Sequence, residues 1–60
     1  MTKSKAITLL KSGLYNLQYV AGKIYRDEKS INAKRMRLVQ RIKTQTLPDE
    51  DVERFERLLW

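Results

Sequence analysis

Helical spacing of the apolar residues constrains the fold of this chain more than any other feature of its sequence. In the first segment, apolar residues recur at steps of three and four, which places them along one stripe of an α-helix. The residues of this stripe are Ile7, Leu10, Leu14, Leu17, Ala21 and Ile24. No stretch alternates apolar and polar residues as a half-buried strand does. The pattern predicts an all-α protein whose first helix covers about residues 4–26.

The first helix has one cap signal and one weak position. A hydroxyl at Ser4 or Thr2 can accept a hydrogen bond from a free backbone N–H group at the helix start. Gly13 lies on the apolar side, where glycine costs about 1 kcal/mol relative to alanine. Two interpretations fit Gly13: it permits close approach of another helix, or it is a tolerated weak point.

A second helix is expected at about residues 31–44. Residues 27–32 are poor in helix formers, and Ser30 or Asn32 can act as the N-cap. The apolar stripe of this helix consists of Ile31, Leu38, Val39 and Ile42. Arg35 lies within that stripe, so its charge must either reach solvent along the extended side chain or be paired, with Glu28 or an acid of the third helix as the expected partner.

A third helix is expected at about residues 47–59. Thr46 reads as its N-cap and Pro48 as a residue of its first turn, where the missing N–H of proline is harmless. The acids that follow, Asp49 and Glu50, meet the positive end of the helix dipole. Three helices with short connections predict a small three-helix bundle that forms a single domain over residues 1–60. The alternative is one long helix over residues 4–44 with a short return helix, paired as a dimer.

The composition argues against catalysis and against a metal site. The 60 residues include no Cys and no His, so disulfides, thiolate and imidazole metal ligands, and the commonest nucleophiles and general bases are all missing. The acids of residues 49–56 are assigned to dipole compensation and solubility. We therefore expect a non-enzymatic protein with no cofactor and no small-molecule substrate. The lack of Cys is compatible with the cytoplasm, which is the expected location.

Positive charge is concentrated before residue 47. Residues 1–46 carry eleven Lys and Arg against two acids, whereas residues 47–60 carry five acids against two Arg, which together give the net charge of +6. On the second helix, Lys34, Arg37 and Arg41 share one face, and a row of cations at this spacing can follow a phosphate backbone. Lys23 and Arg26 lie at the edge of the same expected surface. The pattern predicts a small basic nucleic-acid-binding protein.

A second function class fits the same residues. Tyr15 and Tyr19 lie four residues apart beside the cations of the first helix, and Trp60 ends the chain. These aromatic residues can bind a protein partner or a second copy of the chain, which predicts an adaptor or inhibitor. They can equally cover the side and the end of the bundle core.

A membrane role is not expected. The apolar runs are far shorter than the roughly 20 residues that a spanning helix needs. The apolar stripe of the first helix could lie on an anionic membrane, but the core of a bundle requires the same stripe. Lys11 interrupts the only segment that loosely resembles a signal peptide, so the first residues are expected to be part of the mature fold.

Overall fold

The protein is built from four α-helices in the computed structural model, which describes residues 1–59. The helices are α1 (Lys3–Lys11), α2 (Leu17–Ile24), α3 (Ile31–Thr44) and α4 (Asp49–Leu59). The described residues contain no strand, which confirms the all-α class. Among these residues, no helix combines the length and the apolar character needed to cross a lipid bilayer.

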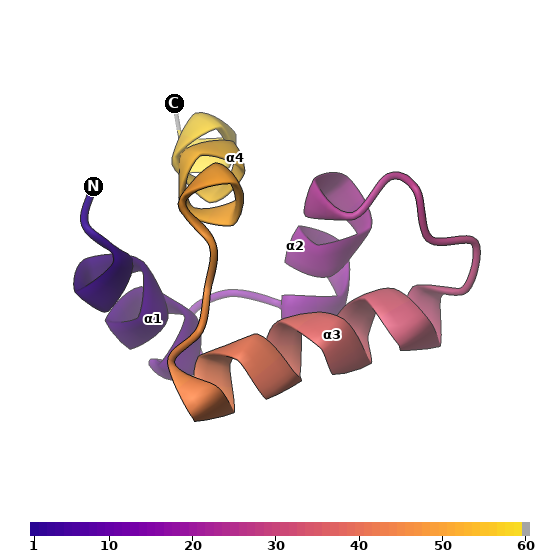
Figure 1. Ribbon diagram of the computed structural model, residues 1–60, viewed down its shortest axis with the longest axis horizontal. Helices are drawn as coiled ribbons and strands as arrows, with labels where there is room; N and C mark the ends of the chain where they lie inside the picture. The colour runs from indigo at the N-terminus through magenta and orange to yellow at the C-terminus, as the bar shows by residue number, and fades with distance from the viewer. Residues whose placement is uncertain (60) are drawn as a thin grey trace.

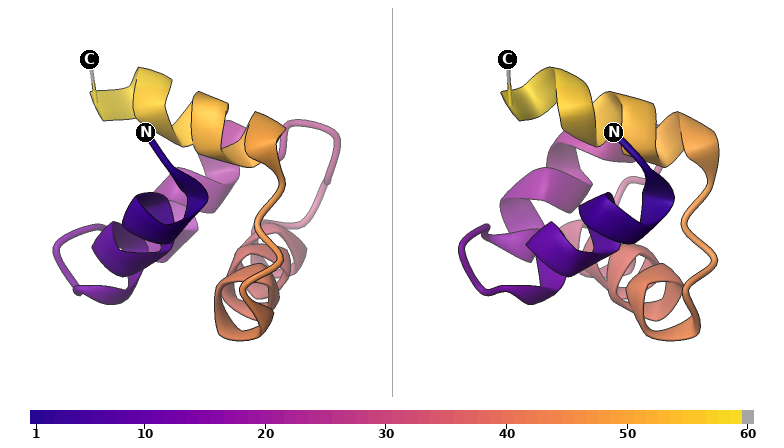
Figure 2. Two further views of the ribbon diagram at one scale, coloured as in Figure 1. Left: turned by 60° about the vertical axis from the view of Figure 1, so that its left-hand side comes forward. Right: turned by 90° about the vertical axis from the view of Figure 1, so that its left-hand side faces the viewer.

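The helices form three levels, with the two short helices in the middle. α3 runs along one side of the molecule and α4 crosses the opposite side, while α1 and α2 lie between them (Figures 1 and 2). α1 and α2 each contact both α3 and α4, and α2 packs most extensively on α3. The middle pair therefore connects the two outer helices through a shared core.

Every helix contributes apolar side chains to one core. The largest fully buried apolar residues are Phe55 of α4, Leu10 of α1, Ile24 of α2 and Leu38 of α3. The complete core is formed by Ala6, Ile7, Leu10, Val20, Ala21, Ile24, Tyr25, Leu38, Ile42, Leu47, Val52 and Phe55. Burial of each large apolar side chain contributes about 2 kcal/mol of hydrophobic stabilisation, which a chain of this size requires to fold.

The predicted helix over residues 4–26 is wrong, because two helices occupy that range. α1 ends at Lys11. The backbone N–H of its C-cap, Ser12, donates to the carbonyl of Leu9, and Gly13 follows with a φ of +83°. Asn16 then caps α2 by accepting a hydrogen bond from the backbone N–H of Tyr19 at 3.1 Å. Left-handed backbone at Gly13 and a capping side chain at Asn16 override the apolar spacing. Leu14, expected in the core, lies in this turn and is 79% exposed.

Both interpretations of Gly13 are also wrong. A Cβ atom at this position would meet no atom within 4 Å, so no helix approaches it closely. Gly13 is not a weak point within a helix either, because it lies in the turn between two helices. The predicted cap at Thr2 is confirmed, since its hydroxyl accepts a hydrogen bond from the N–H of Lys5.

The predicted second helix is confirmed at both ends. α3 covers Ile31–Thr44, and the hydroxyl of Ser30 accepts a hydrogen bond from the N–H of Ala33. Gln45 ends α3 in the left-handed conformation with a φ of +56°. Residues 25–30 interrupt the helical backbone between α2 and α3, so the alternative of one long helix is not adopted.

The third predicted helix begins two residues later in the structure than the sequence predicts. α4 starts at Asp49, and the carbonyl of Pro48 accepts hydrogen bonds from the N–H groups of Asp51 and Val52. The predicted cap at Thr46 is wrong, because its hydroxyl shares a 2.6 Å hydrogen bond with the hydroxyl of Thr44. Leu47 instead lies in the core, so the segment between α3 and α4 is held against the other helices.

Candidate nucleic-acid interface

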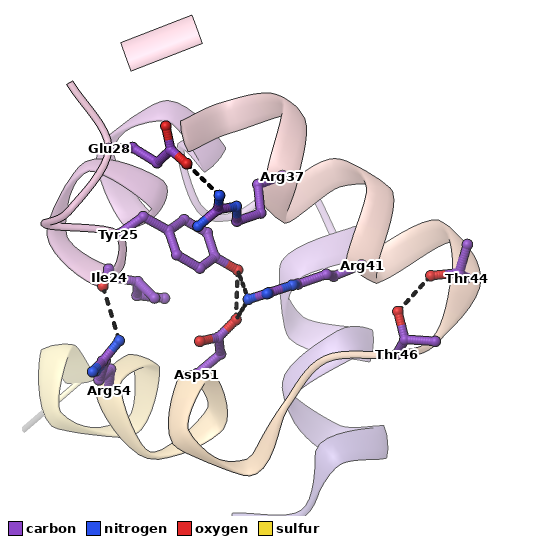
Figure 3. A network of polar contacts seen from close by, with 9 residues as sticks. All are labelled: Ile24, Tyr25, Glu28, Arg37, Arg41, Thr44, Thr46, Asp51 and Arg54. Carbon is purple, nitrogen blue, oxygen red and sulfur yellow. Dashed lines mark hydrogen bonds and ion pairs between the residues drawn. The ribbon is translucent and has the colours of Figure 1, made fainter. Parts of the chain in front are cut away.

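Two of the three cations predicted to form a phosphate-binding row on α3 are bound within the protein. Arg37 donates to the carboxylate of Glu28 and Arg41 donates to that of Asp51 (Figure 3). The guanidinium groups lie 5.5 Å and 5.2 Å from the ring centroid of Tyr25, respectively. Lys34 is half-buried on α3. These contacts turn Arg37 and Arg41 toward the loop after α2 and toward α4, so the row is not an open cationic surface.

The contacts of Arg41 belong to a polar group that we call the Asp51 cluster, consisting of Tyr25, Arg41 and Asp51. The hydroxyl of Tyr25 donates to Oδ2 of Asp51 at 2.5 Å. Nη1 of Arg41 donates to the same Oδ2 at 2.5 Å and to the hydroxyl of Tyr25 at 3.1 Å. Because Asp51 is only 1% exposed, its carboxylate depends on these two donors in place of water.

The pKa values in the Asp51 cluster follow from burial and pairing. Burial and then the hydrogen bond to Asp51 raise the pKa of Tyr25 to about 12. Burial acts to lower the pKa of Arg41, but hydrogen bonds to Tyr25 and Asp51 outweigh it and raise that pKa. Tyr25 therefore stays neutral and Arg41 stays charged at ordinary pH. Oδ1 of Asp51 is buried without a hydrogen-bond partner among the described residues.

Arg35 does not have the role expected from its place in the sequence. It is exposed on α3, and it forms no ion pair with any described residue. The predicted pairing of Arg35 is wrong, because Glu28 pairs with Arg37 and the acid of α4 pairs with Arg41. Glu28, in the loop after α2, and Asp51, in the first turn of α4, lie on the flank of α3 that carries Arg37 and Arg41 (Figure 3).

The other two predicted cations, Lys23 and Arg26, line a hollow between α2 and α4. The hollow has a volume of about 410 Å³, and Arg54 and Arg57 of α4 complete its cationic lining. Its other lining residues are Ile24, Asp27 and Leu58. Four cations therefore share the lining with one carboxylate. We call this site the basic hollow.

The cations of the basic hollow are more exposed to solvent than the charges of the Asp51 cluster. Arg57 pairs with Glu53 at 2.8 Å, but both side chains are exposed and the pair lies one helical turn apart. Nη1 of Arg54 donates to the carbonyl of Ile24 at 3.3 Å, at the last residue of α2. Within the described residues, Lys23 and Arg26 have no ion pair. Exposed cations of this kind can exchange their present contacts for phosphate oxygens at small cost.

The tyrosines predicted as contact residues separate into two roles. Tyr15 is half-buried and meets the ring of Phe55 edge-on, with centroids 5.4 Å apart and planes at 86°. It therefore covers the side of the core, as one of the two interpretations predicts. Tyr19 is 61% exposed, and Nζ of Lys23 lies 5.5 Å from its ring centroid. The predicted contact residue Trp60 lies outside the described residues.

Tyr19 borders a second, more open hollow beside the first, which we call the Tyr19 depression. It has a volume of about 550 Å³ and is lined by Asn16, Gln18, Tyr19, Gly22, Lys23 and Ile31. Gly22 packs closely against Ile31, because a Cβ atom there would lie 3.3 Å from Cδ1 of Ile31. Lys23 lines both hollows, so the Tyr19 depression and the basic hollow adjoin at this residue.

Sequence reasoning missed the contribution of α4 to this surface. Arg54 and Arg57 lie three residues apart, a spacing that places them on one helix face. This spacing could have been read from the sequence. The neighbouring acids balance the charge of both arginines, however, so the segment does not look basic. The roles of Tyr25 and Asp51 left no local signal, since these partners are 26 residues apart in the chain.

Comparison with known proteins gives no relative. Neither the family models, nor the curated proteins, nor the solved structures contain a match to this chain.

Proposed function

We propose that the protein binds nucleic acid through the basic hollow, without catalysing a reaction. The observation that supports this function is the convergence of Lys23, Arg26, Arg54 and Arg57 from two helices around one hollow that contains a single carboxylate. A polyanion with closely spaced phosphates matches such a site, and binding would release its condensed counterions. The proposal places the protein in the cytoplasm, where nucleic acid is abundant.

The proposed surface differs from the α3 row because of what each cation already binds. Moving Arg41 to a phosphate would leave the buried carboxylate of Asp51 without its cation, which is costly. Moving Arg57 to a phosphate would release only an exposed contact with Glu53. Phosphates are therefore expected at the basic hollow, with the α3 row contributing general positive potential.

The test is titration of a fluorescently labelled oligonucleotide, followed by anisotropy over a series of salt concentrations. One variant replaces Lys23, Arg26 and Arg57 together by Gln. The matched control replaces Lys3, Lys5 and Lys11 by Gln, which removes the same net charge from exposed positions of α1. We expect the hollow variant to lose at least about tenfold in affinity at low salt, and its plot of log K against log salt to flatten by about 2. The control variant should lose much less.

Two outcomes count against the proposal. Equal losses in both triple variants would mean that binding follows net charge, without a defined site at the hollow. No binding of DNA or RNA at low salt by the unaltered protein would reject nucleic-acid binding altogether. A pull-down with and without nuclease treatment would then show whether a protein partner binds instead, as the second function class predicts.

A further inference from the structure

We infer that the nucleic acid bound here is single-stranded, and that one of its bases stacks on Tyr19. This inference rests on the proposed function and specifies its ligand. It follows from the Tyr19 depression, which adjoins the basic hollow and shares Lys23 with it. Phosphate binding requires only the cations, so it does not explain the exposed aromatic ring beside them.

The ring of Tyr19 is available to a ligand and is held in position by its helix. Tyr19 lies in the first turn of α2, and Asn16 fixes that turn by accepting a hydrogen bond from the Tyr19 N–H. The side chain is 61% exposed, so stacking on it disturbs no core contact. Every base has a π-face, and stacking on an aromatic side chain is the common way in which proteins hold unpaired bases.

Lys23 belongs to both the Tyr19 depression and the basic hollow. Its ammonium lies 5.5 Å from the centroid of the Tyr19 ring, and it also lines the basic hollow. A nucleotide whose base lies against Tyr19 therefore has its phosphate beside Lys23, and the neighbouring phosphates beside Arg26, Arg54 and Arg57. The side-chain amide of Gln18 lines the same depression and can hydrogen-bond the edge of the base.

A duplex can contact only part of this surface. Its bases are stacked inside the helix, so none can lie on Tyr19 unless the duplex opens. Of the three cations that could follow a duplex backbone along α3, Lys34 has no ion pair among the described residues, but Arg37 pairs with Glu28 and Arg41 pairs with the buried Asp51. The surface therefore favours a flexible strand whose bases are free.

The experiment compares three oligonucleotides of one length: an intact single strand, its duplex, and an abasic strand with the same phosphates. The unaltered protein should bind the intact strand about tenfold more tightly than the abasic strand. Tyr19→Ala should remove that difference by weakening the intact strand about tenfold. Tyr19→Phe should retain it, because stacking requires the ring and not the hydroxyl. Neither change should alter the salt dependence, since no phosphate contact is lost.

The matched control is Leu14→Ala, which truncates another highly exposed side chain outside the depression and should change nothing. Equal affinity of the unaltered protein for intact and abasic strands would overturn the stacking inference, even if the hollow variant still abolishes binding. Tighter binding of the duplex than of the single strand would overturn it as well. Absence of all binding would instead reject the proposed function, so the two failures are distinguishable.

Discussion

The Asp51 cluster and the basic hollow use similar residues for opposite purposes. In the cluster, Arg41 meets a carboxylate that is 1% exposed, and the hydroxyl of Tyr25 hydrogen-bonds to both partners. In the hollow, Arg57 meets the exposed carboxylate of Glu53 and stays in contact with solvent. The burial of the partner, rather than the identity of the cation, separates a charge that stabilises the fold from a charge that is free to bind a ligand.

Removal of the buried carboxylate is expected to have the largest effect on stability. Asp51→Asn leaves Arg41 without its anionic partner and should lower the free energy of unfolding by about 3 kcal/mol. Domains of this size are only a few kcal/mol stable, so the variant should lose most of its helical circular dichroism at room temperature.

The control for Asp51→Asn is Asp49→Asn, which changes an exposed acid in the same helical turn. It should cost no more than about 1 kcal/mol, the range of a helix-dipole contact. Equal destabilisation by both changes would show that the Asp51 cluster contributes nothing beyond the dipole, and the contrast between the two regions would fail.

The Asp51 cluster should also make the free energy of unfolding depend on pH in the alkaline range. The pKa of Tyr25 is about 12 in the folded protein and about 10 in the unfolded chain, so folding favours the neutral phenol. Its contribution, on the order of 2 kcal/mol, is fully present below pH 10 and is lost as the pH rises from 10 through 12. Urea denaturation of the unaltered protein and of Tyr25→Phe across this range measures it. Parallel curves for the two proteins would contradict the assignment.

The cations of the basic hollow should contribute little to stability. The triple replacement of Lys23, Arg26 and Arg57 by Gln should leave the free energy of unfolding within about 0.5 kcal/mol of the unaltered protein. Thermal unfolding followed by circular dichroism checks this. A loss above about 1.5 kcal/mol would mean that these cations hold α2 and α4 together, which would make the two regions alike.

The smallest effect is expected at the exposed ion pair. Glu53→Gln removes the partner of Arg57 and should cost about 0.3 kcal/mol, as is usual for exposed pairs four residues apart on a helix. The same change should strengthen oligonucleotide binding slightly, since it removes a carboxylate that competes for Arg57. A cost close to that of Asp51→Asn would remove the distinction between buried and exposed pairing.

Local signals in the sequence predicted much of the fold. The cap at Ser30 and the apolar stripe after it placed α3 correctly, because caps and periodicity act over a few residues. The same periodicity was misleading over residues 4–26, where Leu14 continues the stripe in sequence but lies in a turn. A left-handed glycine and a capping asparagine end one helix and start another, and both signals were weaker in the sequence than the apolar repeat.

The candidate site was less predictable, because it depends on which helices meet. Lys23 and Arg26 were expected at the edge of a surface on α3, yet they face α4. Arg37 and Arg41 looked free because the residues around them carry no acid, but their partners come from other segments. Charge counts along a chain do not show pairing between segments, and pairing decides which cations remain open.

The middle position of α1 and α2 has a consequence for the order in which the chain folds during synthesis. These helices are made first, but the side of them that faces α4 stays uncovered until Asp49–Leu59 emerges and brings Phe55 into place. A nascent chain that stops before α4 therefore presents an incomplete apolar surface, including the part of Tyr15 that later meets Phe55. Quality control that recognises exposed apolar surface would act on such a chain more strongly than on the complete fold.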